Sequence, residues 1–206
     1  MLFDLFISAF ATLFVVIDPP GCAPIYAGLT ARFDAAHKRA MAIRACMVAG
    51  AILLFFALFG QRLLSALHIG LDAFRIAGGI MLFLIALDMV FEKRTQRREQ
   101  RAEQVLADPA QEDVSIFPMA MPMLAGPGAI ATVMLLQSNA SGVQGTLVVL
   151  AALGLVLAMT LGALLAAGPL MKAVGPRFEA VLTRLLGVLL AALAAQYVID
   201  GVNGSF

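Results

Sequence analysis

Long apolar segments recur along the whole chain, and they limit its possible folds more than any other feature. Each is long enough to cross a bilayer's hydrocarbon core, which is about 30 Å thick. Helices are the expected form, because a lipid-exposed open sheet leaves backbone groups unpaired. With 62% hydrophobic and 13% charged residues among 206, an ordinary soluble domain is excluded. The sequence predicts an all-α, polytopic membrane protein with six transmembrane helices, over Leu2–Leu29, Ala42–Leu64, Asp72–Phe91, Val114–Gln137, Thr146–Ala167 and Ala180–Asp200.

Lysine and arginine gather in and beside the loops that follow the odd-numbered spans. Of the 14 basic residues, only Arg62 and Arg75 lie toward the other face. Cytoplasmic loops of membrane proteins carry an excess of Lys and Arg. This bias predicts a multi-pass protein of the cytoplasmic membrane whose odd-numbered loops are cytoplasmic and whose two termini both lie outside.

One long polar tract, residues 92–113, separates the first three spans from the last three. It mixes both charge signs, so we expect a solvated, partly helical cytoplasmic linker. A patch for nucleic acid or anionic lipid is the alternative, but acids dilute its basic residues, and no nucleic-acid partner is predicted. The chain then divides into a first three-helix repeat (1–91), the linker (92–113) and a second three-helix repeat (114–206), within one membrane domain.

Short motifs in the first half recur in the second at almost the same offset. Pro20-Gly21 aligns with Pro127-Gly128, and "RIAGG" from Arg75 aligns with "RLLGV" from Arg184. Each half has three spans, so the two copies would cross the membrane in opposite directions. The motifs therefore predict two inverted three-helix repeats, an arrangement found in secondary transporters.

Proline placement predicts that the first and fourth helices are broken. Six of the nine prolines fall at corresponding positions in these two spans: Pro19, Pro20 and Pro24, then Pro118, Pro122 and Pro127. A proline removes a helical N–H and pushes the residue before it out of helical geometry, here Asp18 and Gly126. A kinked structural helix is the alternative at each place. Paired interruptions are nevertheless typical of a transporter's binding site near the membrane midplane.

Each break would expose the first N–H groups of a new half-helix, and helix N-termini bind carboxylates. The donors expected to be unsatisfied are those of Gly21, Cys22, Ala23, Gly128, Ala129 and Ile130. The carbonyls freed near Val15, Val16 and Met123 would suit an ammonium group or a cation. The predicted substrate-binding residues are Asp18, Pro19, Pro20, Gly21, Cys22, Ala23, Pro24, Ala125, Gly126, Pro127, Gly128 and Ala129.

Asp18 is the one acid in the two breaks, since Ala125 occupies the aligned position in the second half. An acid deep in a membrane is costly and is a functional candidate by default. It would pair with a substrate ammonium group or carry a coupling proton. Its structural alternative is to cap the half-helix that follows. One carboxylate and two helix N-termini fit a small zwitterion better than a large cation or a dicarboxylate.

Arg75 and Arg184 lie at equivalent positions of the two halves, near opposite membrane faces. As coupling or gating residues they would form ion pairs with Asp18, Asp88 or Asp200. The alternative is that both side chains extend to the nearer lipid headgroups.

No cofactor or metal is predicted for this chain. Cys22 and Cys46 lack the spacing of metal ligands, and the two histidines, His37 and His68, are expected on opposite sides of the membrane. The spans hold no paired carboxylates, serine–lysine or HExxH arrangement, so an enzyme is not predicted. There is no GxxxxGK[ST] nucleotide-binding loop either, which favours transport driven by a gradient.

The stretch "DPPGCAPIY" (Asp18–Tyr26) resembles the D/N-P-x-G-N-x-P-I-F motif of the MarC family, also described as SnatA-type neutral amino-acid transporters. "AGPGAIATV" (Ala125–Val133) and "RIAGGIMLFLIALDM" (Arg75–Met89) are similar to the family's other two motifs, so the resemblance covers essentially the whole chain. Cys22 stands where the family usually has Asn, which removes an amide donor and acceptor beside the break, and Tyr26 replaces the usual Phe. The motif positions that match are Asp18, Pro19, Gly21, Pro24 and Gly126–Gly128.

The resemblance implies a six-helix inner-membrane protein of bacteria or archaea, some relatives of which move glycine, alanine and other small neutral amino acids. We therefore expect a secondary transporter of small neutral amino acids that works by alternating access, coupled to H⁺ or Na⁺. The alternatives are an exporter of drugs or other small metabolites, and a membrane scaffold that transports nothing.

Overall fold

The computed structural model describes residues 2–106 and 113–206, except for the side chains of residues 105–106 and 169–180. All regular structure in these residues is helical, in the order α1 (Leu2–Ile17), α2 (Pro19–Leu29), α3 (Ala35–Ala66), α4 (Leu71–Val90), α5 (Lys93–Leu106), η1 (Ser115–Leu124), α6 (Pro127–Ser138), α7 (Gly142–Leu165) and α8 (Ala167–Gly204). Five segments are long and apolar enough to cross a membrane, with α1 and α2 counted together, and the bent pair of η1 and α6 makes a sixth. The predicted all-α fold is thus confirmed for the described residues, which contain five candidate spans, or six when the bent pair is counted as one span.

Two helices extend well beyond the spans expected from hydropathy. α3 begins at Ala35 rather than Ala42, because Asp34 caps it by accepting a hydrogen bond from the His37 N–H at 2.8 Å. α8 begins at Ala167 rather than at the expected Ala180. For α3, hydropathy marks the part of the helix suited to lipid, whereas the cap determines where the helix begins.

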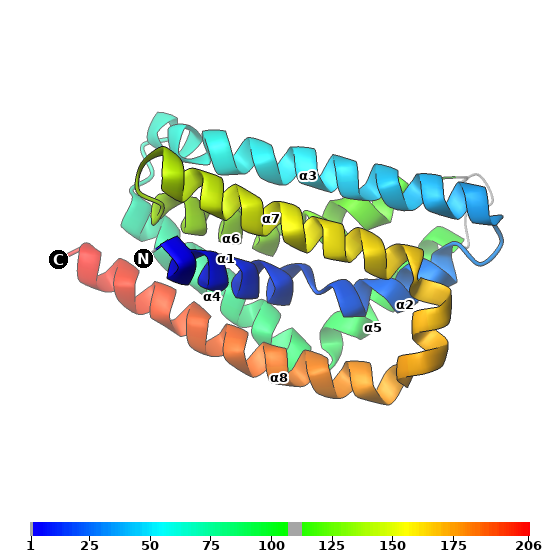
Figure 1. Ribbon diagram of the computed structural model, residues 1–206. Coiled ribbons are helices and arrows are strands. Elements are labelled where there is room, and N and C mark those ends of the chain that lie inside the picture. The colour runs from blue at the N-terminus through cyan, green and yellow to red at the C-terminus, as the bar shows by residue number, and fades with distance from the viewer. Residues whose placement is uncertain (1, 107–112) are drawn as a thin grey trace.

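The helices form an elongated bundle with both chain ends at the same end of it (Figure 1). The opposite end, where α2 leads into α3 and α7 into α8, is called the basic end here because the loops predicted to be cytoplasmic lie there. α1 and α2 pack against α7, while η1 and α6 pack against α3, and α4 lies along α8. This exchange of partners is the pattern expected from two related halves. The inverted repeat, its boundaries and the sidedness of the bundle stay predictions.

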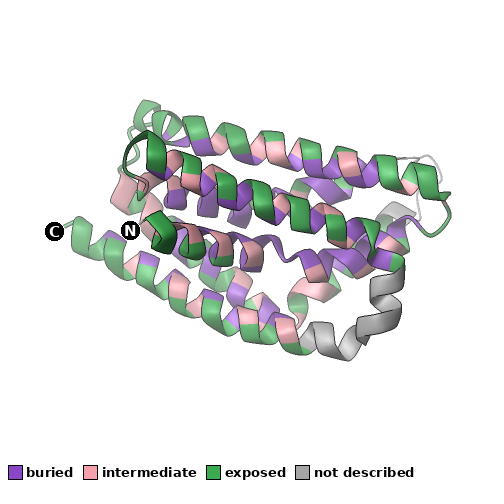
Figure 2. Cartoon of the chain, in the orientation of Figure 1, coloured by how far each residue is buried: buried purple, intermediate pink, exposed green. Residues whose placement is uncertain are grey.

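Buried and exposed residues separate by face along the long helices, whereas the connection from α1 to α2 is buried throughout (Figure 2). The outward faces carry exposed apolar side chains such as Phe55, Leu147 and Leu185. Such faces suit lipid rather than water. The interrupted spans therefore lie inside the bundle, with the continuous helices around them.

The polar tract is partly helical, as expected, and most of its described side chains are exposed, but one face of it is not solvated. Lys93–Leu106 form a helix, α5, that packs against α2, α4 and η1. Only Phe91 and Glu92 connect it to α4, and Glu92 adopts a left-handed conformation with φ 59°. This tight turn directs α5 back toward the breaks. The rest of the predicted linker, residues 107–112, lies outside the described residues.

Candidate functional site

The first break consists of one residue. α1 ends at Ile17 and α2 begins at Pro19, with Asp18 between them in the left-handed region at φ 59° and ψ 66°. Aspartate is among the few residues that tolerate this region. Pro19 and Pro20 occupy the first turn of α2, where N–H groups have no acceptor within the helix, so the absence of theirs loses no helical hydrogen bond. The predicted departure of Asp18 from helical geometry is confirmed.

Asp18 caps the helix that follows it and is only 2% exposed. Its carboxylate accepts a hydrogen bond from the Gly21 N–H at 3.1 Å, and its carbonyl accepts one from the Cys22 N–H at 3.1 Å. A Cβ at residue 21 would overlap that carboxylate, so Gly21 is what lets it fold over the helix end. The prediction that the Gly21 and Cys22 donors are unsatisfied is therefore wrong, because the acid beside the prolines is an efficient cap.

The second break is longer and less regular. Phe117 and Met121 are extended, each directly before a proline, so η1 (Ser115–Leu124) is only partly helical. Ala125 and Gly126 then separate η1 from α6 with a bend of 52°. Gly126 is extended as predicted, at φ −78° and ψ 172°, and a Cβ there would overlap the carbonyl oxygen of Pro122.

No side chain of the described residues caps α6. The Ile130 N–H donates to the Gly126 carbonyl at 3.0 Å, so this one of the three predicted donors is not free. Gly128 and Ala129, in the first turn, line a pocket between the two breaks. The second break therefore presents the bare, partially positive start of a helix to that pocket.

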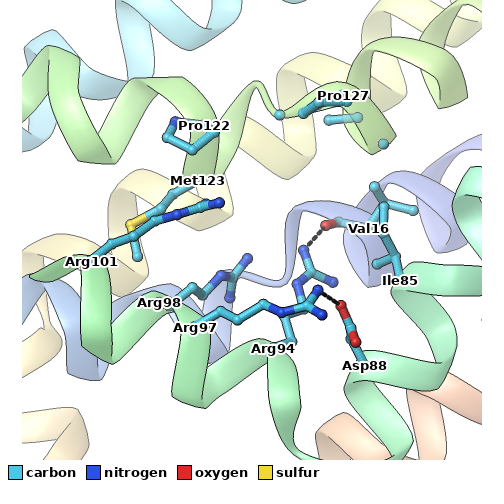
Figure 3. Close-up of a pocket in the computed structure, with 13 residues that line it drawn as sticks. Val16, Ile85, Asp88, Arg94, Arg97, Arg98, Arg101, Pro122, Met123 and Pro127 are labelled. Carbon is cyan, nitrogen blue, oxygen red and sulfur yellow. Dashed lines mark hydrogen bonds and ion pairs between the residues drawn. The ribbon is translucent and has the colours of Figure 1, made fainter.

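The opposite wall of the pocket comes from α5. Arg94, Arg97, Arg98 and Arg101 project from it toward the space between Val16 and Pro127 (Figure 3). We call this space the arginine pocket; its volume is about 150 Å³, and its other lining residues are Val16, Ile85, Asp88, Pro122, Met123, Gly126, Pro127, Gly128 and Ala129.

Arg98 reaches deepest and forms a buried ion pair with Asp18. The distance from its Nη1 to the carboxylate is 2.8 Å, and the two side chains are 7% and 2% exposed. Its Nη2 also lies 3.4 Å from the carbonyl oxygen of Ile17, at the end of α1. The acid predicted to hold a substrate ammonium group is thus paired with a cation from the same chain.

Arg94 binds one of the three carbonyls that were expected to be free, that of Val16. Its guanidinium also lies 3.0 Å from the sulfur of Met89. Burial, followed by the neighbouring Arg98 guanidinium, lowers the pKa of Arg94 to about 10, so it is still a cation at neutral pH. The prediction of free acceptors near Val16 is wrong in this conformation, because guanidinium groups bind them.

The remaining two arginines lie toward the open side of the pocket. Arg97 pairs with Asp88, and its side chain is 61% exposed. Arg101 lies beside Met123 and is exposed, and no acid of the described residues pairs with it (Figure 3). The pocket and its floor therefore hold four guanidinium groups against two carboxylates, Asp88 and Asp18, which favours an anionic group in the remaining space.

The structure brings together some of the predicted site residues and separates others. Gly126, Pro127, Gly128 and Ala129 line the pocket, and Asp18 lies behind it through Arg98. Five residues of α2 and one of the second break do not line it, although all six are predicted site residues: Pro20, Gly21, Cys22, Ala23, Pro24 and Ala125. Pro19 is buried at the start of α2 and likewise lies outside the lining.

Arg75 and Arg184 bind residues other than the acids expected as their gating partners. Arg75 binds Asp72 and Asn139, both at 3.0 Å, at the end of the bundle opposite the basic end. Arg184 pairs with Glu92 at 2.5 Å. The three acids proposed as partners bind other residues: Arg98, Arg97 and Gln196. Sequence spacing alone does not reveal that α5 supplies closer partners.

The arginines of α5 are the site residues that the sequence analysis missed. Their spacing of three, one and three residues places them on one face of a helix, while Glu99, Gln100 and Glu103 lie elsewhere on it. That pattern is the signal that distinguishes this helix from a solvated linker. No group of three or more potential metal ligands occurs among the described residues.

This chain is similar in sequence to a known family of integral membrane proteins. The family described as MarC family integral membrane protein matches residues 3–206. The chain is 36% identical to the UPF0056 membrane protein MJ1677 of Methanocaldococcus jannaschii over 203 residues, which is 97% of each chain. It is 32% identical to the UPF0056 membrane protein YvbG of Bacillus subtilis over 206 residues, 100% of this chain and 98% of that one. It is also 32% identical to the UPF0056 inner membrane protein YhgN of Escherichia coli K12 over 197 residues, 96% and 95% of the two chains. No solved structure matches.

Proposed function

Because this chain belongs to the MarC family of integral membrane proteins, we propose that it is a secondary transporter of small neutral amino acids such as glycine and alanine. It works by alternating access in the cytoplasmic membrane, the location that the name of the Escherichia coli relative supports. The observation that carries the proposal is the arginine pocket, which lies between two broken spans, with the uncapped start of α6 on one side and, behind Arg98, the carboxylate of Asp18 on the other. Broken helices around a small site are characteristic of secondary transporters.

The side formed by α6 suits a carboxylate. Gly128 and Ala129 present the uncapped start of a helix, and Arg101 adds a guanidinium with no acid partner among the described residues. Helix N-termini and arginine guanidinium groups both bind carboxylates favourably.

The side formed by the first break suits an ammonium group. Asp18 supplies a buried carboxylate, and the carbonyls of Val16 and Ile17 supply acceptors, as their contacts with arginines demonstrate. A cavity of about 150 Å³ holds a molecule the size of benzene in other proteins. Glycine and alanine have no more heavy atoms than benzene, whereas most drugs are far larger. Size and charge therefore support a small zwitterion over a drug.

Uptake of labelled glycine and alanine into proteoliposomes tests this function. We expect uptake by the intact chain and its loss in Asp18→Asn and in Asp18→Asn/Arg98→Met, the second of which leaves no unpaired buried charge. Separate H⁺ and Na⁺ gradients identify the coupling ion, which we expect to be one of the two. If well-folded protein neither binds nor moves any small zwitterion, the proposal is wrong, and full uptake by both variants would exclude a role for Asp18.

A further inference from the structure

We propose that Arg98 occupies the position of the substrate's ammonium group at Asp18, and that α5 leaves the pocket when an ammonium group takes that position. The inference rests on the proposed function and adds to it how the site selects and admits its substrate. On this view α5 is an exchangeable part of the site.

The contacts of Arg98 are those that an ammonium group would make. Its guanidinium bridges the Asp18 carboxylate at 2.8 Å and the Ile17 carbonyl at 3.4 Å, where α1 ends. A carboxylate together with helix C-terminal carbonyls forms a cation site. Arg98 and an amino acid cannot both occupy it, because the two side chains of the ion pair are already almost fully buried.

The energetics of exchange make the substrate's ammonium group a requirement. If Arg98 leaves without a replacement, Asp18 becomes an uncompensated buried charge, which is strongly destabilising. If an ammonium group replaces it, Asp18 keeps a partner and the guanidinium returns to water. A small carboxylic acid without an ammonium group makes no favourable contact with Asp18 and cannot replace Arg98 there. The exchange therefore selects zwitterions from a pocket whose net charge alone would attract any small anion.

α5 is held in place by few buried groups. Between Lys93 and Gln104, only Arg98 and Ala102 are buried, with 5% and 8% exposure. The helix connects to α4 through a two-residue turn, so it has a pivot at Glu92. Its release would expose little apolar surface. The contacts that must be replaced are the Arg98–Asp18 and Arg97–Asp88 pairs and the hydrogen bond from Arg94 to the Val16 carbonyl, and the first of these is the most deeply buried ion pair.

Thiol labelling at Ala102 reports release of α5, because this residue is exposed only when the helix leaves. In Ala102→Cys protein we expect slow modification by a polar maleimide and an increase of at least about fivefold with saturating alanine. Propionate, which has the carboxylate but no ammonium group, should leave the rate unchanged. Glu103→Cys is the matched control, since residue 103 is exposed already, and the parent chain gives the background of its buried Cys22 and Cys46.

A second readout is the binding of alanine to Arg98→Met. Without the internal competitor, alanine should bind about tenfold more tightly or better, and Ala102→Cys in this background should label rapidly without substrate. The inference is overturned if alanine is transported but leaves the labelling rate unchanged, if propionate acts as alanine does, or if Arg98→Met weakens binding. If the intact chain neither binds nor transports alanine, the proposed function itself is wrong. The uptake measurement identifies that outcome separately from the labelling experiments, which test only the release of α5.

Discussion

The two breaks in the bundle are made from similar residues, Pro-Gly in both, yet they present opposite chemistry to the pocket between them. At the first, Asp18 caps α2 and pairs with Arg98, so the start of the helix is covered and the groups that face α5 are acceptors: the Asp18 carboxylate and the carbonyls of Val16 and Ile17. At the second, Gly126 provides no cap, so α6 presents donors. The cap residues differ: Asp18 has a carboxylate that covers the start of α2, whereas Gly126 has no side chain to cover the start of α6.

The comparison teaches that related motifs need not form equivalent half-sites. Two capped breaks would bind cations only, and two bare breaks would bind anions only. One of each gives a pocket with a place for either end of a zwitterion. The asymmetry therefore carries the proposed specificity, and three variants test whether each break acts as its chemistry predicts.

Asp18→Asn should have the largest effect on stability. Asparagine still caps a helix, so the substitution isolates the loss of the ion pair, and it leaves Arg98 buried without a partner. We expect a loss of about 3–5 kcal/mol in the free energy of unfolding, measured by chemical denaturation in detergent. Adding Arg98→Met should recover all but about 1 kcal/mol. Additive losses in the double variant would mean that the two residues do not act as a pair.

Gly126→Ala tests the second break, which depends on bare backbone. The new Cβ would overlap the Pro122 carbonyl oxygen, which cannot rotate away as a side chain could. We expect a loss of about 1–3 kcal/mol in the free energy of unfolding, together with slower uptake, because the start of α6 must shift. Gly28→Ala is the control: no atom lies within 4 Å of the added carbon, and the change should be neutral or stabilising. Equal stability of the two variants would contradict the geometry at Gly126.

Arg101→Gln should have the smallest effect and should act on the anionic end of the substrate. Loss of one charge beside α6 is expected to raise KM for alanine about tenfold while kcat changes little, since the residue aids binding rather than the conformational change. Arg62→Gln, an exposed arginine outside the pocket, should leave KM unchanged. A fall in kcat with constant KM would instead assign Arg101 to the conformational cycle.

Local covalent chemistry explains which parts of the site could be predicted. Proline fixes its own φ and restricts the preceding residue wherever it occurs. The departures of Asp18 and Gly126 from helical geometry therefore followed from the sequence. The same rule accounts for the extended Phe117 and Met121. The cap at α2 was foreseen only as an alternative, because hydropathy and motif spacing say nothing about which donor an acid will accept from.

The position of α5 could not be predicted in this way. Its partners lie far away in the chain: Arg98 and Asp18 are 80 residues apart, and Arg94 and Val16 are 78 apart. Charge content made the segment look solvated, although the spacing of its arginines marked one face. Whether the arginine face contacts water or buried acceptors depends on the direction that the turn at Glu92 gives to α5, and on the elements that α5 then packs against.

The sequence by itself determined the helical fold and the places where two apolar segments are interrupted, because each follows from local rules of hydropathy and backbone sterics. Only the tertiary structure decided that the interruptions face a common pocket and that Arg98 covers Asp18. A buried charge takes whichever opposite charge the fold places beside it. That partner depends on distances in space, which spacing along the chain does not contain.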